Sequence, residues 1–408
     1  MDLSALREPR RWMIYMLGSF PLVDYFLHIY PWGIIGGSWD KIVLLFLAFY
    51  ALRKYMAEGK PSLYPTHRYL VFMVVLGLVY VLMDVDYIVV ALAGYRVDFW
   101  YMLYALLLPF VVEKEDVIPL LRTIAFTGFL MSLHGVYQYI IRAPIPPQWV
   151  DITQHVRTRV YSLFGSPNIF GDYAAFVTPI SAAIALYEKE RAQRLFYGFG
   201  ALLSAATLVF TDTRAAWLSF FIGALVFTWL LDRRMAIITF AVAVLAALFV
   251  PPIHARLGEF FTPVYWSKTF ANGRISEAER AFDQMRANPL FGAGLGRYGG
   301  AIASRYFGVI YVDNYYAKTL AEIGLLGLFT FVALIFVYLR DVFRVVKRTV
   351  NRRKRILFIG AYVGIVIVAI NNLFENVFEV PDMNALFWLT GSLLLIYAAK
   401  GGLQDEES

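Results

Sequence analysis

The chain has 408 residues, of which 60% are hydrophobic, 17% aromatic and only 16% charged. This composition excludes an ordinary soluble domain, in which about a quarter of the residues carry a charge. The chain contains no cysteine and only five histidines, none of them in a paired spacing, so neither a disulfide nor a dedicated metal site is expected.

Apolar segments long enough to cross a bilayer follow one another along the whole chain. A helix needs about 17–25 such residues to cross roughly 30 Å of hydrocarbon. The segments are continuous rather than alternating, which predicts helices and not the strands of a barrel. We therefore expect an all-α transmembrane helix bundle of about twelve spans, near residues 12–30, 39–53, 68–84, 97–112, 117–141, 168–187, 194–210, 215–231, 235–251, 313–339, 356–372 and 382–399.

These segments divide the chain into four parts. Residues 1–250 are expected to form the first nine spans, 251–312 a large outer loop with helices, 313–400 the last three spans, and 401–408 a short tail. No repeat of one half in the other is evident, and the middles of the spans are nearly free of charge. A transporter or flippase is therefore less favoured than an enzyme that works at the outer surface.

The Lys and Arg residues predict the orientation of the chain. If the N-terminus is cytoplasmic, the strongest basic cluster, at residues 340–355, faces inward, together with most other basic connections. Both termini are then cytoplasmic, and the two long connections, 142–167 and 251–312, face outward. The net charge of +7 follows from these inner connections and does not indicate nucleic-acid binding.

The second long connection contains an amphipathic pattern. Ile275, Ala278, Phe282 and Met285 have helical spacing, and Asn288-Pro289 ends the predicted helix. Its polar face would carry Arg274, Glu277, Arg280, Asp283 and Arg286, most of which a solvated helix surface explains. The following Gly-rich stretch, 292–296, has no preceding strand, so it indicates a tight turn and not a dinucleotide site.

Several arginines are expected at the outer membrane edge. Arg214 is distinctive because the connection 211–214 is too short to hold its guanidinium far from the bundle. Guanidinium groups bind phosphate oxygens bidentately, so this edge favours an anionic ligand. Because nucleotide sugars are mainly cytoplasmic, a phosphate bound on the outer side would belong to a lipid-linked compound. Asp313 and Asn314 begin the tenth span, where a helix N-cap is the simplest explanation.

A recognisable pattern is formed by segments 164–171 and 213–218 and by a group at 273–274, 288–294, 313–316 and 322–328. It resembles the pattern of the superfamily of O-antigen ligases and O-antigen polymerases of the bacterial envelope. The first, 164–171, is similar to the family's Gly/Asn/Pro turn before a span, and the second, 213–218, to its S-R-(G/A)-A-W motif. The third combines Gly273-Arg274, 288–294, 313–316 and 322–328. Their order and spacing across residues 155–330 carry the resemblance, since each motif alone is weak.

The resemblance implies a GT-C-like glycosyltransferase of the bacterial inner membrane, with a periplasmic active site and no metal or other cofactor. Such enzymes move a glycan from undecaprenyl pyrophosphate to an acceptor glycan or to lipid A-core, among membrane lipids and in some cases with a chain-length regulator. By position, Arg214 and Arg274 would hold the pyrophosphate, while Asp313 and Asn314 would act on the acceptor hydroxyl. The candidate substrate-binding residues are Arg157, Arg159, Asn168, Arg280, Arg297, Tyr315 and Glu322.

One position separates the two branches of the superfamily. Ligases generally have a His-Asn pair where this chain has Asp313-Asn314. An aspartate can accept a proton or orient a hydroxyl, but it lacks the neutral/cationic switch of an imidazole. The sequence therefore favours a polymerase of lipopolysaccharide or capsule repeat units, with a ligase as the alternative.

Overall fold

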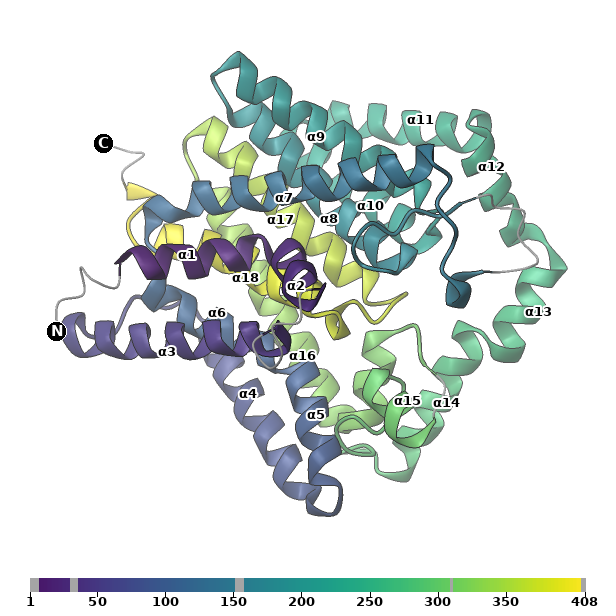
Figure 1. Cartoon of the computed structure of the whole chain (residues 1–408), viewed down its shortest axis with the longest axis horizontal. Coiled ribbons are helices and arrows are strands. Elements are labelled where there is room, and N and C mark those ends of the chain that lie inside the picture. Colours follow the sequence, from purple (N-terminus) through teal and green to yellow (C-terminus); the bar gives the residue numbers. More distant parts are fainter. Residues whose placement is uncertain (1–6, 30–35, 151–157, 309–310, 405–408) are drawn as a thin grey trace.

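The computed structural model describes residues 7–29, 36–150, 158–308 and 311–404. In these ranges the chain forms α-helices and short 3-10 helices and no strand, which confirms the predicted all-α class (Figure 1). The α-helices are α1 (Arg7–Gly18), α2 (Phe20–Ile29), α3 (Trp39–Glu58), α4 (Thr66–Met83), α5 (Ile88–Asp98), α6 (Trp100–Val111), α7 (Lys114–Ile140), α8 (Pro167–Tyr187), α9 (Arg191–Phe210), α10 (Arg214–Leu231), α11 (Arg233–Phe249), α12 (Pro251–Gly258), α13 (Pro263–Asn272), α14 (Arg274–Ala287), α15 (Ala301–Phe307), α16 (Tyr315–Arg348), α17 (Arg352–Asn371) and α18 (Pro381–Ala399). The 3-10 helices are η2 (Gly36–Ser38), η3 (Val85–Tyr87), η4 (Pro147–Trp149), η5 (Glu259–Phe261) and η6 (Val377–Glu379).

Eight of these helices are long and apolar enough to cross a membrane: α4, α7, α8, α9, α10, α16, α17 and α18. Two more spans result if each bent pair counts as one, namely η3–α5 with α6, bent by 48°, and α11 with α12–η5, bent by 86°. The polytopic helix bundle is confirmed, but the described residues hold up to ten spans rather than about twelve.

The first two expected segments account for the difference. Segment 12–30 is divided at Ser19 between α1 and α2, which have 12 and 10 residues. Each is too short to cross roughly 30 Å of hydrocarbon at about 1.5 Å per residue. Segment 39–53 lies in α3, which has 20 residues but carries charges at both ends, among them Asp40 and Lys54. Within the described ranges, counting apolar segments therefore gives more spans than helix length and composition support.

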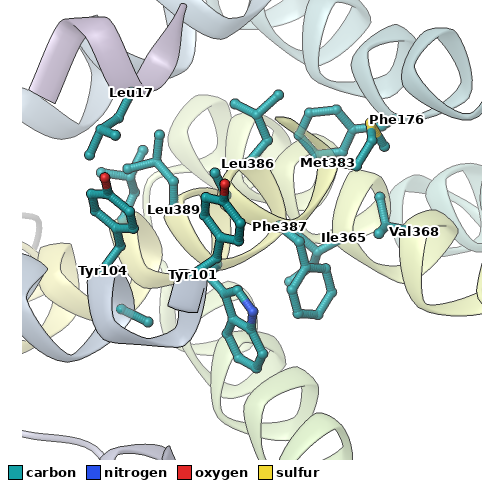
Figure 2. Close-up of a cluster of buried hydrophobic side chains, with 14 of the residues drawn as sticks. Leu17, Tyr101, Tyr104, Phe176, Ile365, Val368, Met383, Leu386, Phe387 and Leu389 are labelled. Carbon is teal, nitrogen blue, oxygen red and sulfur yellow. The ribbon is translucent and has the colours of Figure 1, made fainter. Parts of the chain in front are cut away.

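Helices α8, α17 and α18 form the centre of the bundle (Figure 1). The apolar stretches of α8 and α18 are each 83% buried, compared with 22% for α9. Figure 2 shows side chains from several helices meeting in this core, among them Tyr104, Phe176 and Phe387. The backbones of α8 and α17 approach closely at Gly360, where an added Cβ would lie 2.3 Å from the Cβ of Ala183. Helix α8, which leads into the candidate site, is therefore rigidly held.

Two basic connections meet at one end of the bundle. Glu113, just before α7, pairs with Lys54 at the end of α3 and, at 2.7 Å, with Lys400 after α18. Helices α12–α15 and the connections 211–213 and 372–380 lie at the other end, on the far side from the start of α1 and the end of α18 (Figure 1). The bundle thus separates Lys54 and Lys400 from the largest loop.

The long connection 251–312 is largely helical. Helix α14 covers the predicted amphipathic stretch, and Asn288 follows it as the C-cap residue, as predicted. The packed face differs from the prediction, because Ala281 and Met285 are buried whereas Phe282 is 51% exposed. The face of α14 that packs against the bundle is therefore rotated from the face that the apolar spacing indicates.

Helix α16 extends the expected span 313–339 to Arg348, and it is broken at Gly324, where φ is +66°. The segment after α14 lies along this break. The backbone N–H of Leu325 donates to the carbonyl of Pro289 at 2.8 Å, and the N–H of Gly294 donates to the carbonyl of Glu322 at 2.8 Å. The Gly-rich stretch 292–296 thus forms tight turns, and the hydrogen bonds of this segment stabilise the break in α16.

Gly324→Ala is expected to destabilise the protein, because an added Cβ would lie 2.5 Å from the carbonyl group of Leu290. The left-handed φ adds strain, and a residue held in such a region costs about 1–3 kcal/mol. Thermal unfolding in detergent measures the effect. The matched control is Gly37→Ala, where an added Cβ meets no atom within 4 Å. Equal unfolding midpoints for the two variants would contradict this account of the break.

Candidate functional site

The start of α8 and the turn between α9 and α10 form one wall of the candidate site. Ser166 caps α8 by accepting from the N–H of Ile169 at 3.4 Å, and Pro167 follows at the first helical position, where proline is favoured. The next residue, Asn168, belongs to the first turn of α8. The sequence Gly-Ser-Pro-Asn thus places the Asn168 amide at the end of the bundle that carries the long loop.

Arg159 connects the residues of this wall by hydrogen bonds. Its Nε donates to the carbonyl of Thr211 at 2.9 Å, and its guanidinium also donates to the Asn168 side chain at 2.8 Å and to the Thr213 hydroxyl at 3.3 Å. The turn it holds is tight, since Asp212 has a φ of +55°. Burial lowers the pKa of Arg159 to about 10, which still leaves the group cationic at neutral pH. Arg159 therefore supports the site as a buried positive charge.

Arg214 begins α10 and faces the corner between α12 and α13. Its guanidinium donates to the Glu259 carboxylate at 3.0 Å. The rings of Phe260 and Tyr265 each lie 5.0 Å from the guanidinium carbon, within range of a cation–π contact. A short connection does hold this arginine at the bundle, and the contacts with η5 and α13 fix its direction.

Arg274 and Asp313 form a second part of the site. Arg274 is the first residue of α14, and its guanidinium lies 3.5 Å from the Asp313 carboxylate, with both side chains more than a third exposed. The N–H of Asp313 donates to Glu277 at 3.1 Å. Burial raises the pKa of Asp313, although the charge of Arg274 opposes the rise. The N-cap of α16 is Asn314, which accepts from the N–H of Ala317 at 3.0 Å, so Asp313 is not needed as the cap.

Charge interactions connect the two parts of the site, the one around Arg214 and the one around Arg274. Arg214 lies within range of the charges of both Arg256 and Arg274, although these residues come from three different helices. The fold thus gathers several guanidinium groups and the Asp313 carboxylate at one end of the bundle. Such a concentration of fixed positive charge suits a multiply charged anion.

The connection between α17 and α18 contributes residues that the sequence reasoning missed. The Asn168 side chain donates to Glu375 at 3.0 Å, and the N–H of Tyr315 donates to the carbonyl of Asn372 at 2.9 Å. Burial and the charge of Asp313 raise the pKa of Glu375 to about 8, whereas Arg274 and the bond from Asn168 oppose the rise. No motif marks Glu375 as a site residue, because only the packing of α8 and α16 against this connection brings it there.

Arg256 is a second missed residue. It lies in α12, with its Nε 3.3 Å from the Asp212 carboxylate and its guanidinium 2.9 Å from Glu259. Among the described residues of the loop it is nearly buried, with 8% of its side chain exposed. The spacing of Arg256 and Glu259, three residues apart on a helix, was a possible signal for their pairing.

Two of the predicted binding residues belong to a separate buried cluster. The Lys318 ammonium lies 2.9 Å from Asp98, 2.9 Å from Glu322 and 3.4 Å from Glu379. The hydroxyl of Tyr315 also donates to Asp98, at 2.9 Å. Tyr315 and Glu322 therefore anchor the start of α16 against α5 and η6, and the structure does not bring them to the arginines.

Two further predicted arginines, Arg297 and Arg280, interact with other groups. Arg297 pairs with Asp84, and its guanidinium carbon lies 3.9 Å from the ring centre of Tyr87. Arg280 lies on the polar face of α14, where its charge acts on Glu277. Arg157 lies outside the described residues. Within the described ranges, no group of three or more His, Asp or Glu side chains is arranged to hold a metal ion.

A known protein family matches the part of the chain that forms this end of the bundle. Residues 199–332 match the sequence profile of the O-antigen ligase family. The matched segment begins in α9 and ends in α16, so it contains Arg214, Arg256, Arg274 and Asp313 and covers less than half of the chain. No curated protein sequence matches the chain. Through this segment the chain is similar to O-antigen ligases.

Proposed function

We propose that the protein polymerises glycan repeat units carried on undecaprenyl pyrophosphate, at the outer face of the bacterial inner membrane. The observation that carries the proposal is that Arg214 and Arg274, from different helices, lie within range of each other's charge, and that Arg274 lies 3.5 Å from the Asp313 carboxylate. The family match supports a membrane enzyme of surface-glycan assembly. The positive charges of Lys54 and Lys400 at the opposite end of the bundle support the outward position of the site.

In this proposal Arg214 and Arg274 bind the diphosphate of the donor. The bond between the anomeric carbon and the phosphate oxygen breaks, and negative charge grows on that oxygen. Fixed guanidinium groups stabilise this charge without reorganisation, and such stabilisation commonly contributes more to the rate than any other single effect. Undecaprenyl pyrophosphate leaves with the bonding electron pair.

The acceptor hydroxyl attacks the anomeric carbon from the face opposite the diphosphate, so the configuration inverts. Asp313 takes the hydroxyl proton as the new glycosidic bond forms. Its raised pKa brings its basicity nearer to neutral pH, where a general base works best. The products are the lengthened glycan, undecaprenyl pyrophosphate and one proton.

A ligase that uses lipid A-core as acceptor is the second candidate, since the family profile is named for that activity. The position of Asp313 favours the polymerase, because the ligases of the resembled superfamily carry a histidine there. His134 and His254 make other contacts, with the Ser162 hydroxyl at 3.2 Å and with the carbonyl of Ala247 at 3.2 Å.

The test incubates purified protein with an undecaprenyl-pyrophosphate-linked repeat unit, with and without lipid A-core, and sizes the products. A ladder formed without lipid A-core is expected. A product formed only with lipid A-core would identify a ligase. The absence of product in both reactions, from folded protein, would refute the proposed glycan transfer.

The rate of transfer is expected to fall above about pH 8, the pKa of Glu375. Below this pH the carboxyl is neutral, and above it a new negative charge appears near Arg274 and the donor diphosphate. If the ionised form binds no donor, kcat/KM falls about tenfold for each further pH unit. Glu375→Gln stays neutral and should lose this alkaline decline. A variant that keeps the decline would exclude Glu375 as its source.

A further inference from the structure

We propose that Glu259 is a built-in competitor for the donor diphosphate, and that Arg256 is a third cation of the same binding site. This inference rests on the proposed function and extends it, since it identifies what the arginines hold when no donor is bound. It assigns a role to the corner between α12 and α13, which the proposed mechanism leaves unused.

Glu259 bridges two arginines. Its Oε2 accepts from Arg214 at 3.0 Å, and its two oxygens accept from Arg256 at 3.0 and 2.9 Å. A carboxylate that accepts from two guanidinium groups makes the same charge-assisted contacts that a phosphate group would make. Glu259 therefore occupies the position between the arginines that best suits an anionic oxygen.

Arg256 is held in place independently of Glu259. The Asp212 carboxylate lies 3.3 Å from Nε of Arg256, and the Asp212 carbonyl accepts from the same guanidinium at 3.5 Å. Arg214 lies against the rings of Phe260 and Tyr265. The side chain of Arg256 is 8% exposed, whereas that of Glu259 is 36% exposed. The Glu259 carboxylate can therefore leave toward the surface while Arg256 stays in place.

The local charge balance favours replacement of the Glu259 carboxylate by a diphosphate. Arg159, Arg214 and Arg256 act on the Asp212 carboxylate together with Glu259, so three cations share two carboxylates at this turn. A diphosphate brings more negative charge and more acceptor oxygens than one carboxylate. Its binding would replace the two contacts of Glu259 and complete the charge balance.

The position of Glu259 in the chain allows it to move. It begins the single turn of η5, directly after Gly258, where an added Cβ would meet no atom within 4 Å. Phe261, at the end of the same turn, is largely exposed. Displacement of Glu259 therefore requires only the η5 turn and the start of α13 to shift, and Phe260 and Tyr265 would move with it.

The experiment measures the affinity of purified protein for inorganic pyrophosphate by calorimetry in detergent. Glu259→Gln removes the competing charge and is expected to bind about tenfold more tightly, whereas Arg256→Gln should bind about tenfold more weakly. Asp283→Asn is the matched control, because Asp283 is an exposed carboxylate that pairs with Arg286 on α14. Unchanged or weaker binding by Glu259→Gln would overturn the role of Glu259, and unchanged binding by Arg256→Gln would overturn that of Arg256.

A second measurement needs no variant. Hydrogen exchange of the wild-type protein should become faster in η5 and the start of α13 when pyrophosphate is added, because Glu259 then releases the arginines. Slower or unchanged exchange there, with pyrophosphate bound, would overturn the inference. Failure of the proposed function is separate, since it shows as absent transfer with a lipid-linked donor, whatever the affinity for pyrophosphate.

Discussion

Replacing Arg214 or Arg274 by alanine is expected to lower the rate of glycan transfer by about 10²–10³-fold, the usual cost of removing one group that stabilises transition-state charge. The loss should appear mainly in kcat, because the charge on the leaving phosphate oxygen grows as the bond breaks. The measurement is the initial rate with a lipid-linked repeat unit and purified variants.

The control for these variants is Arg286→Ala. Arg286 lies on the same helix as Arg274, but it is exposed and pairs only loosely with Asp283, at 3.7 Å. Its loss should leave the rate within about twofold of the wild type, since exposed ion pairs contribute at most about 1 kcal/mol. Normal transfer by folded Arg214→Ala would remove this arginine from the catalytic account.

Lys318→Met is expected to destabilise the fold strongly. The Lys318 ammonium is the shared partner of Asp98, Glu322 and Glu379, and all four side chains are nearly buried. Removing one member of a buried ionic cluster costs about 3–5 kcal/mol, because the remaining charges lose their compensation. Thermal unfolding in detergent should show a large fall in the midpoint or a loss of folded protein.

A second substitution separates lost charge from lost packing. If uncompensated carboxylates cause the instability, adding Glu322→Gln to Lys318→Met should restore part of the midpoint, because one buried negative charge is removed. A double variant less stable than Lys318→Met would assign the effect to packing. A Lys318→Met variant as stable as the wild type would show that the cluster does not hold the start of α16.

The parts of the site that local sequence determines could be predicted. Arg214 lies at the bundle because α9 and α10 are joined by three residues, and α14 forms because its apolar residues have helical spacing. The pairing of Arg274 with Asp313 joins positions that the family motifs already mark. In the first two cases a short stretch of chain contains the information, and in the third the family motifs indicate the two positions.

The parts that depend on tertiary packing could not be predicted. Lys318 and Asp98 are 220 residues apart in the sequence, so nothing local indicates their contact. Glu375 enters the site only because Asn168 donates to it across 207 residues. The break at Gly324 was also missed, because a glycine within an apolar run does not reveal that another segment packs against it.

The most direct test of the proposed site is a structure of the protein in lipid nanodiscs with undecaprenyl pyrophosphate bound. We expect the diphosphate to lie within hydrogen-bonding distance of Arg214 and Arg274, near Asp313, with the lipid chain entering the bilayer beside the bundle. A diphosphate bound at the opposite end, near Lys54 and Lys400, or one that contacts neither arginine, would contradict the proposed site.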